Sequence, residues 1–190
     1  MNQVIFLDLK FILTPESVYK TWPFDLKISH EAIEVLKVSS MANFKTVIVF
    51  NLQEILADIR LLYLQTEIEK QLMNYKIKLS GFYYCPHAGE DCLCKKPMAG
   101  LLFEAAGDLD IDLNSSWLMG DQLIDIEAGN RAGCKTVLIA NGSETNWQLT
   151  PVRQPDFVSS SFYQGTAAIV LKNIYQKLFQ ARNAGLSLTA

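Results

Sequence analysis

Short apolar runs alternate with segments of helical periodicity along this 190-residue chain, and this alternation constrains its fold more than any other feature. Each run is short and rich in β-branched or aromatic residues, which favours a strand buried on both faces. The runs cover residues 4–7, 46–50, 81–84, 117–119 and 136–140, with a last edge strand at 157–158. The segments between them have apolar residues at helical spacing: 29–38, 54–75, 100–107, 124–132 and 166–181. We therefore predict a doubly wound parallel α/β sheet with helices on both faces.

Three helix ends are predicted from single residues. Ser29 is typical of an N-cap, and Gly107 and Gly133 are typical of positions where a helix stops. The closing helix over residues 166–181 is expected to turn four side chains toward the core: Ala168, Leu171, Tyr175 and Leu178.

Length and composition favour one compact domain. A chain of this length can bury about 70% of its unfolded surface around one core. We expect a single domain over residues 1–184 and a frayed tail over residues 185–190. Hydrophobic residues make up 49% and charged residues 19% of the chain, which excludes a disordered protein.

Charge and hydropathy also exclude some classes of partner. The net charge of −3 and the pI near 5.4 lack the basic excess that nucleic-acid binding needs, although a small anionic ligand remains compatible with them. No apolar stretch approaches the roughly 20 residues that span a bilayer. The first residues lack the basic and small-residue features of a secretory signal. We expect a cytoplasmic protein without nucleic-acid or membrane partners.

Three cysteines and a histidine lie within ten positions: Cys85, His87, Cys92 and Cys94. Three thiolates and one imidazole complete a tetrahedral zinc site, and a site with four protein ligands is structural because no position stays open for water. The alternative is an ordinary surface loop with incidental cysteines. The fourth cysteine, Cys134, lies in an apolar stretch and is expected to be a small buried side chain.

Three polar residues come at or just after the ends of predicted strands. They are Asp8, Asn51 and Asp121. Because ligands of open α/β sheets bind at the carboxyl ends of the strands, one crevice is expected to hold all three.

From residue 83 onward the chain resembles a known family. Residues 83–94 read YYCPHAGEDCLC, residues 95–106 continue as KKPMAGLLFEAA, and residues 117–139 read WLMGDQLIDIEAGNRAGCKTVLI. These motifs resemble the haloacid dehalogenase superfamily, in particular its zinc-loop branch of heptose bisphosphate and histidinol-phosphate phosphatases. The resemblance extends over most of residues 4–140. It implies a doubly wound core, a magnesium ion and a phosphoryl group carried briefly on an aspartate.

The resemblance also assigns roles to individual residues. It makes Asp8 the nucleophile and, with Asp121 and Asp125, a ligand of magnesium, a hard cation that prefers oxygen ligands. It makes Lys96 the lysine that neutralises phosphate oxygens. Lys95 and Asn51 take positions that contact substrate. Without the resemblance, Asp121 reads as a helix N-cap, Asp125 as a first-turn acid, the lysines as solvated loop residues and Asn51 as a turn residue.

Two motifs depart from the family pattern. An active member has Asp-x-Asp-Gly-Thr after the first strand, whereas this chain has Asp8, Lys10 and Phe11 there. The second aspartate is the acid and base of the reaction, and an ammonium with a pKa near 10.4 replaces neither function at pH 7. Lys10 also competes with magnesium if its ammonium reaches Asp8. In the second motif Phe50 replaces a phosphate-binding hydroxyl.

These departures leave alternatives open. The first is a sugar-phosphate phosphatase with weak or lost turnover, acting on a small phosphorylated metabolite of carbohydrate metabolism. The second is a non-catalytic module that binds a phosphorylated ligand or a protein. The third is different chemistry at Asp8, since family members that cleave carbon–halogen or carbon–phosphorus bonds also lack the second aspartate. We favour the first.

Overall fold

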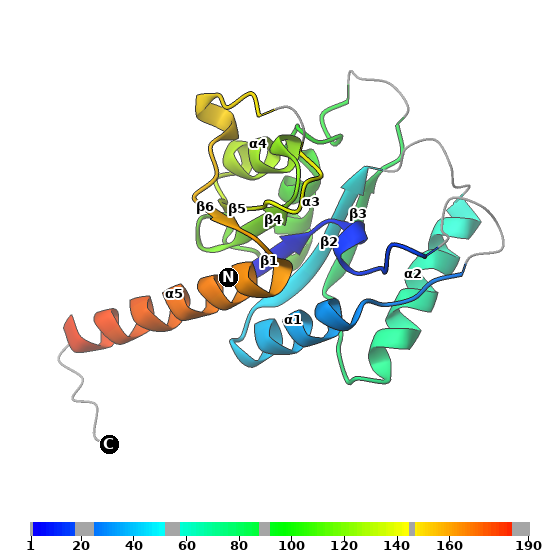
Figure 1. The fold of residues 1–190 in the computed structure, drawn as a ribbon, viewed down its shortest axis with the longest axis horizontal. Coiled ribbons are helices and arrows are strands. Elements are labelled where there is room, and N and C mark those ends of the chain that lie inside the picture. The colour runs from blue at the N-terminus through cyan, green and yellow to red at the C-terminus, as the bar shows by residue number, and fades with distance from the viewer. Residues whose placement is uncertain (1, 18–24, 52–57, 88–91, 145–146, 184–190) are drawn as a thin grey trace.

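The computed structural model describes residues 2–17, 25–51, 58–87, 92–144 and 147–183, and these form a parallel sheet between two helical layers (Figure 1). The sheet order is β3-β2-β1-β4-β5-β6, and every strand pair in it is parallel. The strands are β1 (Val4–Leu7), β2 (Lys45–Asn51), β3 (Gly81–Cys85), β4 (Trp117–Gly120), β5 (Lys135–Ile139) and β6 (Phe157–Ser159). The predicted doubly wound α/β fold is confirmed.

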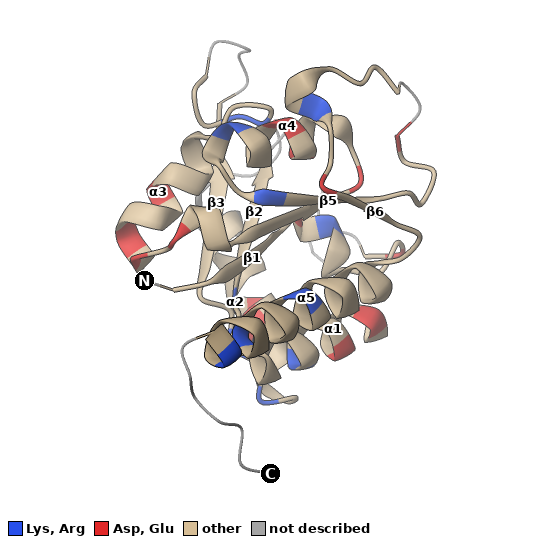
Figure 2. Cartoon of the chain, turned by 90° about the vertical axis from the view of Figure 1, so that its left-hand side faces the viewer, with Lys and Arg blue, Asp and Glu red and all other residues tan. Residues whose placement is uncertain are grey.

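Helices cover both faces of the sheet. They are α1 (His30–Met41), α2 (Asp58–Met73), α3 (Gly100–Leu109), α4 (Leu123–Ala132) and α5 (Phe162–Asn183). Figures 1 and 2 show α1 and α5 side by side on one face and α3 and α4 on the other. Residues 54–57 of the predicted second helix and the predicted tail lie outside the described residues.

β1 is a continuous apolar run because each of its faces packs in a separate hydrophobic core. Side chains alternate along a strand, so Ile5 and Leu7 join the core under α1, α2 and α5, whereas Val4 and Phe6 join the core under α3 and α4. All four are buried. Neither face of β1 therefore tolerates a polar side chain.

Two of the predicted helix ends are confirmed and one is wrong. Ser29 caps α1, accepting a hydrogen bond from the backbone N–H of Ala32 at 3.0 Å, and Gly133 ends α4 with a φ of 80°. The helix predicted to stop at Gly107 continues to Leu109 and ends at Asp110, whose φ is 51°. A glycine weakens a helix interior by about 1 kcal/mol but does not end it, and aspartate is one of the few other residues that visit the left-handed region.

The predicted inner face of α5 is wrong. Leu171, Tyr175 and Leu178 are 67%, 70% and 47% exposed, and Ala168 is only half-buried. The opposite stripe faces the sheet instead, because it contains Gly165, where an added Cβ would lie 2.8 Å from Met119 Cε. The small residue, not the largest apolar ones, decides which face approaches the core.

No helix in the described part of the chain is long and apolar enough to cross a bilayer.

Candidate functional site

The carboxyl ends of β1, β2 and β4 lie together because β1 pairs with both neighbours. Asp8 follows β1, Asn51 ends β2 and Asp121 follows β4. Two further residues reach this edge: Lys96, from the loop before α3, and Asp125, from the first turn of α4. The structure thus gathers the polar residues that the sequence places at the strand ends.

Asp8 caps a 3₁₀ turn where the family pattern has a glycine turn. Its Oδ1 accepts a hydrogen bond from the backbone N–H of Lys10 at 3.1 Å, and the turn covers Leu9–Phe11. Phe11 packs on Phe162 of α5 with ring centroids 5.0 Å apart, and Ile12 is fully buried. These apolar anchors fix the direction in which the chain leaves β1.

Lys96 is buried between two carboxylates. Its Nζ donates to Asp8 Oδ2 at 2.5 Å and to Asp125 Oδ1 at 2.6 Å. Burial alone would lower the pKa of Lys96, but the carboxylates of Asp125 and Asp8 raise it above its ordinary value. Burial alone would raise the pKa of Asp8, but Lys96 and Lys10 together hold it below its ordinary value. Lys96 therefore stays charged and Asp8 stays ionised at neutral pH.

The second ammonium in the site belongs to Lys10, and it forms an ion pair with Asp121. Asp121 is buried; its Oδ1 faces the Lys10 ammonium and has no hydrogen bond among the described residues, and its Oδ2 accepts from Asn141 Nδ2 at 3.2 Å. Lys10 is one-third exposed, and with Asp121, Asn141 and Thr14 it lines an open pocket of about 260 Å³. Of the three strand-end carboxylates, Asp121 is the one that lines this pocket.

Asp125 is held by the start of α4. Gln122, not Asp121, caps this helix, so the N-cap interpretation of Asp121 is wrong, whereas Asp125 does lie in the first turn and accepts from the Gln122 backbone N–H at 3.2 Å. Burial raises the pKa of Asp125 despite the pull of Lys96. Gly120 lets the helix approach β4 this closely, because an added Cβ there would lie 2.1 Å from Asp125 Cβ.

Asn51 holds the backbone of Lys96. Its Oδ1 accepts from the Lys96 N–H at 2.9 Å, and its Nδ2 donates to the Lys96 carbonyl at 3.2 Å. The side-chain amide of Asn51 thus helps to position the lysine.

Two other residues of the family motifs lie nearby in the chain. Phe50 is buried beside Tyr84, with ring centroids 6.0 Å apart, and Lys95 is half-exposed in the loop.

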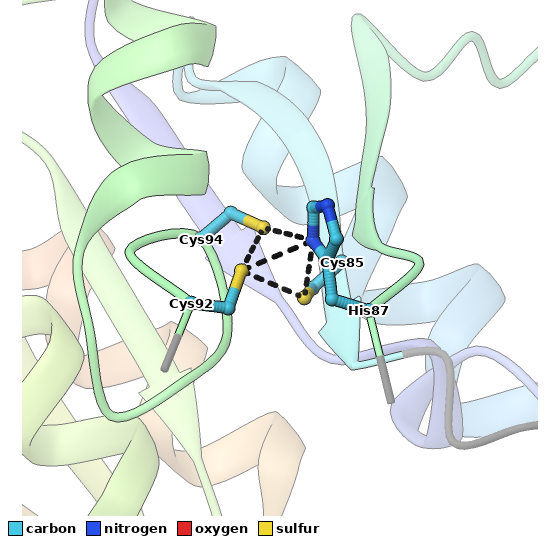
Figure 3. Close-up of side chains that lie close together, drawn as sticks. All are labelled: Cys85, His87, Cys92 and Cys94. Atoms are coloured by element: carbon cyan, nitrogen blue, oxygen red, sulfur yellow. Dashed lines mark hydrogen bonds between the residues drawn. The ribbon is translucent and has the colours of Figure 1, made fainter. Parts of the chain in front are cut away.

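The cysteine and histidine side chains converge from β3 and the following loop (Figure 3). Their ligand atoms lie within 4.8 Å of one another. Cys92 Sγ is 2.8 Å from Cys94 Sγ, 3.5 Å from Cys85 Sγ and 3.1 Å from His87 Nδ1. A zinc ion with bonds of about 2.3 Å to sulfur sets tetrahedral sulfur atoms about 3.8 Å apart. The Cys85–Cys92 separation is near this value and the Cys92–Cys94 separation is about 1 Å shorter, so the four donors surround one ion position but are drawn closer together than bound ligands would be.

Local contacts hold this cluster in place. The backbone N–H of Gly100 donates to the Leu93 carbonyl at 2.9 Å, and an added Cβ at Gly100 would lie 2.4 Å from that oxygen. A hydrogen bond from the Cys94 thiol lowers the pKa of Cys92 to about 6, while burial raises the pKa of Cys94. The loop is thus packed directly on the start of α3 and contains a thiol that ionises readily.

Comparison with known proteins decides the family. Residues 93–164 match the family model described as HAD-hydrolase-like. The D-glycero-β-D-manno-heptose-1,7-bisphosphate 7-phosphatase of Pasteurella multocida is 32% identical over 154 residues, which cover 75% of this chain and 84% of that enzyme. The chain belongs to the haloacid dehalogenase (HAD)-like hydrolase family. The Helicobacter pylori (strain 26695) phosphatase of the same name is 31% identical over 73% of this chain and 83% of its own length.

Solved structures show the same HAD fold. The D,D-heptose 1,7-bisphosphate phosphatase from B. bronchiseptica, complexed with magnesium and phosphate, superposes with a TM-score of 0.70 at 21% identity, covering 93% of this chain and 99% of that one. A HAD-like phosphatase from Mesorhizobium loti gives a TM-score of 0.70 at 20% identity over 90% of this chain and 86% of its own.

The HAD site of this chain does not fit magnesium as the family pattern does. Asp8, Asp121 and Asp125 offer the oxygen ligands that the ion takes. However, the Lys10 ammonium lies against Asp121 and the Lys96 ammonium lies between Asp8 and Asp125. Each carboxylate therefore already has a cationic partner.

Sequence reasoning missed three residues that shape the strand-end site and the cysteine loop. Asn141 comes two residues after the last residue of β5, so the rule on strand ends could have found it. Gly120 directly precedes Asp121, and a glycine at a strand end indicates a close approach. Gly100 gave no such signal, because it reads as an ordinary residue at the start of a helix.

Proposed function

We propose that this chain is a phosphatase-fold protein that binds a small phosphorylated sugar and hydrolyses phosphomonoesters weakly or not at all. Its relatives support the ligand class, since those of similar length are named as heptose bisphosphate phosphatases. The observation that carries the proposal is the Lys10–Asp121 ion pair, which puts a cation where the family pattern has its acid and base.

The remaining residues could carry out the first step of the reaction, the attack on phosphorus, but not the second, the hydrolysis of the aspartyl phosphate. Asp8 is ionised and could attack phosphorus, and Lys96 supplies positive charge beside it. In the described part of the segment after β1, no side chain replaces the family's acid for the leaving oxygen or its base for the attacking water. Loss of general acid–base catalysis alone reduces a rate by about 10²- to 10⁴-fold.

The zinc assignment is part of the same proposal. Cys85, His87, Cys92 and Cys94 would hold one structural zinc ion, which would stabilise a loop with little regular hydrogen bonding. Because the last of these residues is only two positions before Lys96, the ion would also help to set the position of the phosphate-binding lysine.

The test is a phosphate-release screen with heptose bisphosphate, histidinol phosphate and an aryl phosphate, each with and without magnesium. Turnover at least about 10²-fold below that of an intact relative is expected. Aryl phosphates should suffer least, because their leaving groups need little protonation. Lys10→Asp alone should restore little activity, since Phe11 and Phe50 still replace the turn and the hydroxyl. A kcat between about 1 and 10³ s⁻¹ would refute the proposal.

A non-catalytic module is the second candidate. It is favoured by Asn51, whose Nδ2 and Oδ1 each bond the Lys96 backbone. Phosphate binding with no release from any substrate would select this candidate over a weak enzyme.

A further inference from the structure

The charges of the strand-end site nearly balance without any ion. Asp8, Asp121 and Asp125 supply three negative charges, and Lys10 and Lys96 supply two positive ones. All three carboxylates contact an ammonium group. One negative charge therefore remains.

The same balance results from the family pattern by a different route. With an aspartate at position 10, the site would contain four carboxylates and the Lys96 ammonium, a net charge of −3. One magnesium ion would bring this to −1. Exchanging that aspartate for lysine also adds two positive charges, so Lys10 supplies the charge that the ion would bring.

The position of Lys10 suits this role better than that of Lys96. The Lys96 side chain is 3% exposed and is enclosed by its two carboxylates, whereas the Lys10 side chain is 34% exposed. Lys10 lines the 260 Å³ pocket with Asp121 and Asn141, and its ammonium pairs with the buried carboxylate of Asp121. An anion entering this pocket would meet Lys10.

We propose that Lys10 acts as a tethered cation in place of magnesium, so that the pocket binds a phosphomonoester or phosphate ion without a divalent metal. This inference rests on the proposed function, because it names how the same site holds its ligand. Magnesium is disfavoured because it needs near-octahedral oxygen ligands and loses its water reluctantly, while the Lys10 ammonium occupies and neutralises Asp121.

The experiment is calorimetric titration with inorganic phosphate in EDTA and, separately, in millimolar magnesium. The wild-type chain should bind with the same Kd, within about twofold, in both buffers. Lys10→Met should weaken binding by roughly 10- to 100-fold, the usual contribution of one charged hydrogen bond. Lys10→Arg should retain binding, which separates loss of charge from damage to the fold.

Lys10→Asp tests the exchange directly. This variant should bind phosphate poorly in EDTA and at least tenfold better with magnesium. The matched control is Lys78→Asp, the same charge change at an exposed lysine before β3, on the opposite edge of the sheet, and it should behave like the wild type.

Wild-type binding that requires magnesium, or Lys10→Met binding as tightly as the wild type, would overturn the tethered cation. Neither result would touch the proposed function, which requires only that the chain binds a phosphorylated ligand and turns it over slowly or not at all. Fast turnover accompanied by metal-independent phosphate binding would refute the proposed function and leave the tethered cation standing. No phosphate binding by a folded wild-type chain in either buffer would overturn both.

Discussion

The loop of Cys85, His87, Cys92 and Cys94 and the strand-end site of Asp8, Asp121 and Asp125 are linked through Lys96 but differ in their contacts. Cys94 and Lys96 are separated by one residue. The loop brings four possible metal donors within 4.8 Å of one another, whereas the strand-end site has a lysine paired with one of its carboxylates.

This difference separates what the fold needs from what the reaction needs. A structural metal site contributes free energy of folding, so losing one ligand removes stability at once. A catalytic aspartate beside other buried carboxylates adds repulsion, and replacing it by a cation relieves that repulsion. Stability and catalysis therefore favour opposite residues at position 10.

The largest expected effect is on the loop. Cys94→Ala should remove zinc and lower the free energy of unfolding by about 5 kcal/mol, since a complete structural zinc site contributes about 10–16 kcal/mol in small peptides. Cys134→Ala is the matched control, because Cys134 is buried but lies outside the cluster. Metal analysis and thermal unfolding measure both variants. Wild-type protein without zinc, or equal loss of stability in the two variants, would show that the loop is not a structural metal site.

Lys96→Met tests whether the strand-end site is also part of the fold. Removing this ammonium leaves Asp8 and Asp125 buried without their partner, which should lower the free energy of unfolding by about 3–5 kcal/mol at pH 7. Without the ammonium, the pKa values of both carboxylates should rise. They then become protonated as the pH falls, and the loss of stability should shrink. Denaturant unfolding at pH 7 and pH 5 measures this, with Lys95→Met as the control. A loss that does not depend on pH would contradict the charge argument.

Glu127 provides a charged cluster with no part in either site. Its carboxylate accepts from Arg153 Nε at 2.7 Å and from Arg131 Nη2 at 2.6 Å. Burial alone would raise the pKa of Glu127, but the two arginines hold it below its ordinary value. Its contribution is therefore complete above the unfolded pKa of about 4.3 and is lost as the pH falls through the lower, folded value.

Glu127→Gln should accordingly lower the free energy of unfolding by about 2 kcal/mol at pH 7, and the difference from the wild type should shrink below about pH 4. The control is Glu69→Gln on the exposed side of α2. Denaturant unfolding between pH 3 and pH 7 measures both. A difference that grows as the pH falls would show that the sign is wrong.

The smallest expected effect concerns the link between the two regions. Asn51→Ala removes both side-chain hydrogen bonds to the Lys96 backbone and should lower the free energy of unfolding by about 1 kcal/mol. The Lys96 amide should then exchange its hydrogen roughly tenfold faster if it opens locally. Asn74→Ala, at an exposed turn after α2, is the control. Unchanged exchange at Lys96 would show that the loop alone positions this lysine.

The fold could be predicted because both faces of the central strands are buried. β1 and residues 47–50 of β2 are apolar without interruption, and a run of that kind has few other places in a domain. The inner face of α5 could not be predicted, because the helix has two apolar stripes and the choice depends on Gly165 meeting Met119 across the core. Local periodicity does not contain that contact.

The two sites also differ in how far local sequence determines them. The convergence of the three cysteines and the histidine follows from their spacing, which restricts where four donors within ten positions can lie. The partner of Lys10 depends on where a long side chain ends after the 3₁₀ turn that replaces the family's glycine turn. The sequence leaves open whether its ammonium reaches Asp8, and in the structure it pairs with Asp121.

The central place of β1 in the sheet has a consequence for the order in which the protein forms. β1 pairs with β2 soon after both are synthesised, but its other edge waits for β4, where Ile5 lies opposite Trp117. At about 5–20 residues per second, a ribosome needs on the order of 10 s to make the intervening chain. An apolar strand edge is open for that time, and such long-range pairing is slow. Because the site needs Asp8, Lys96 and Asp121 together, we expect ligand binding to report completed folding and a truncated chain to have none.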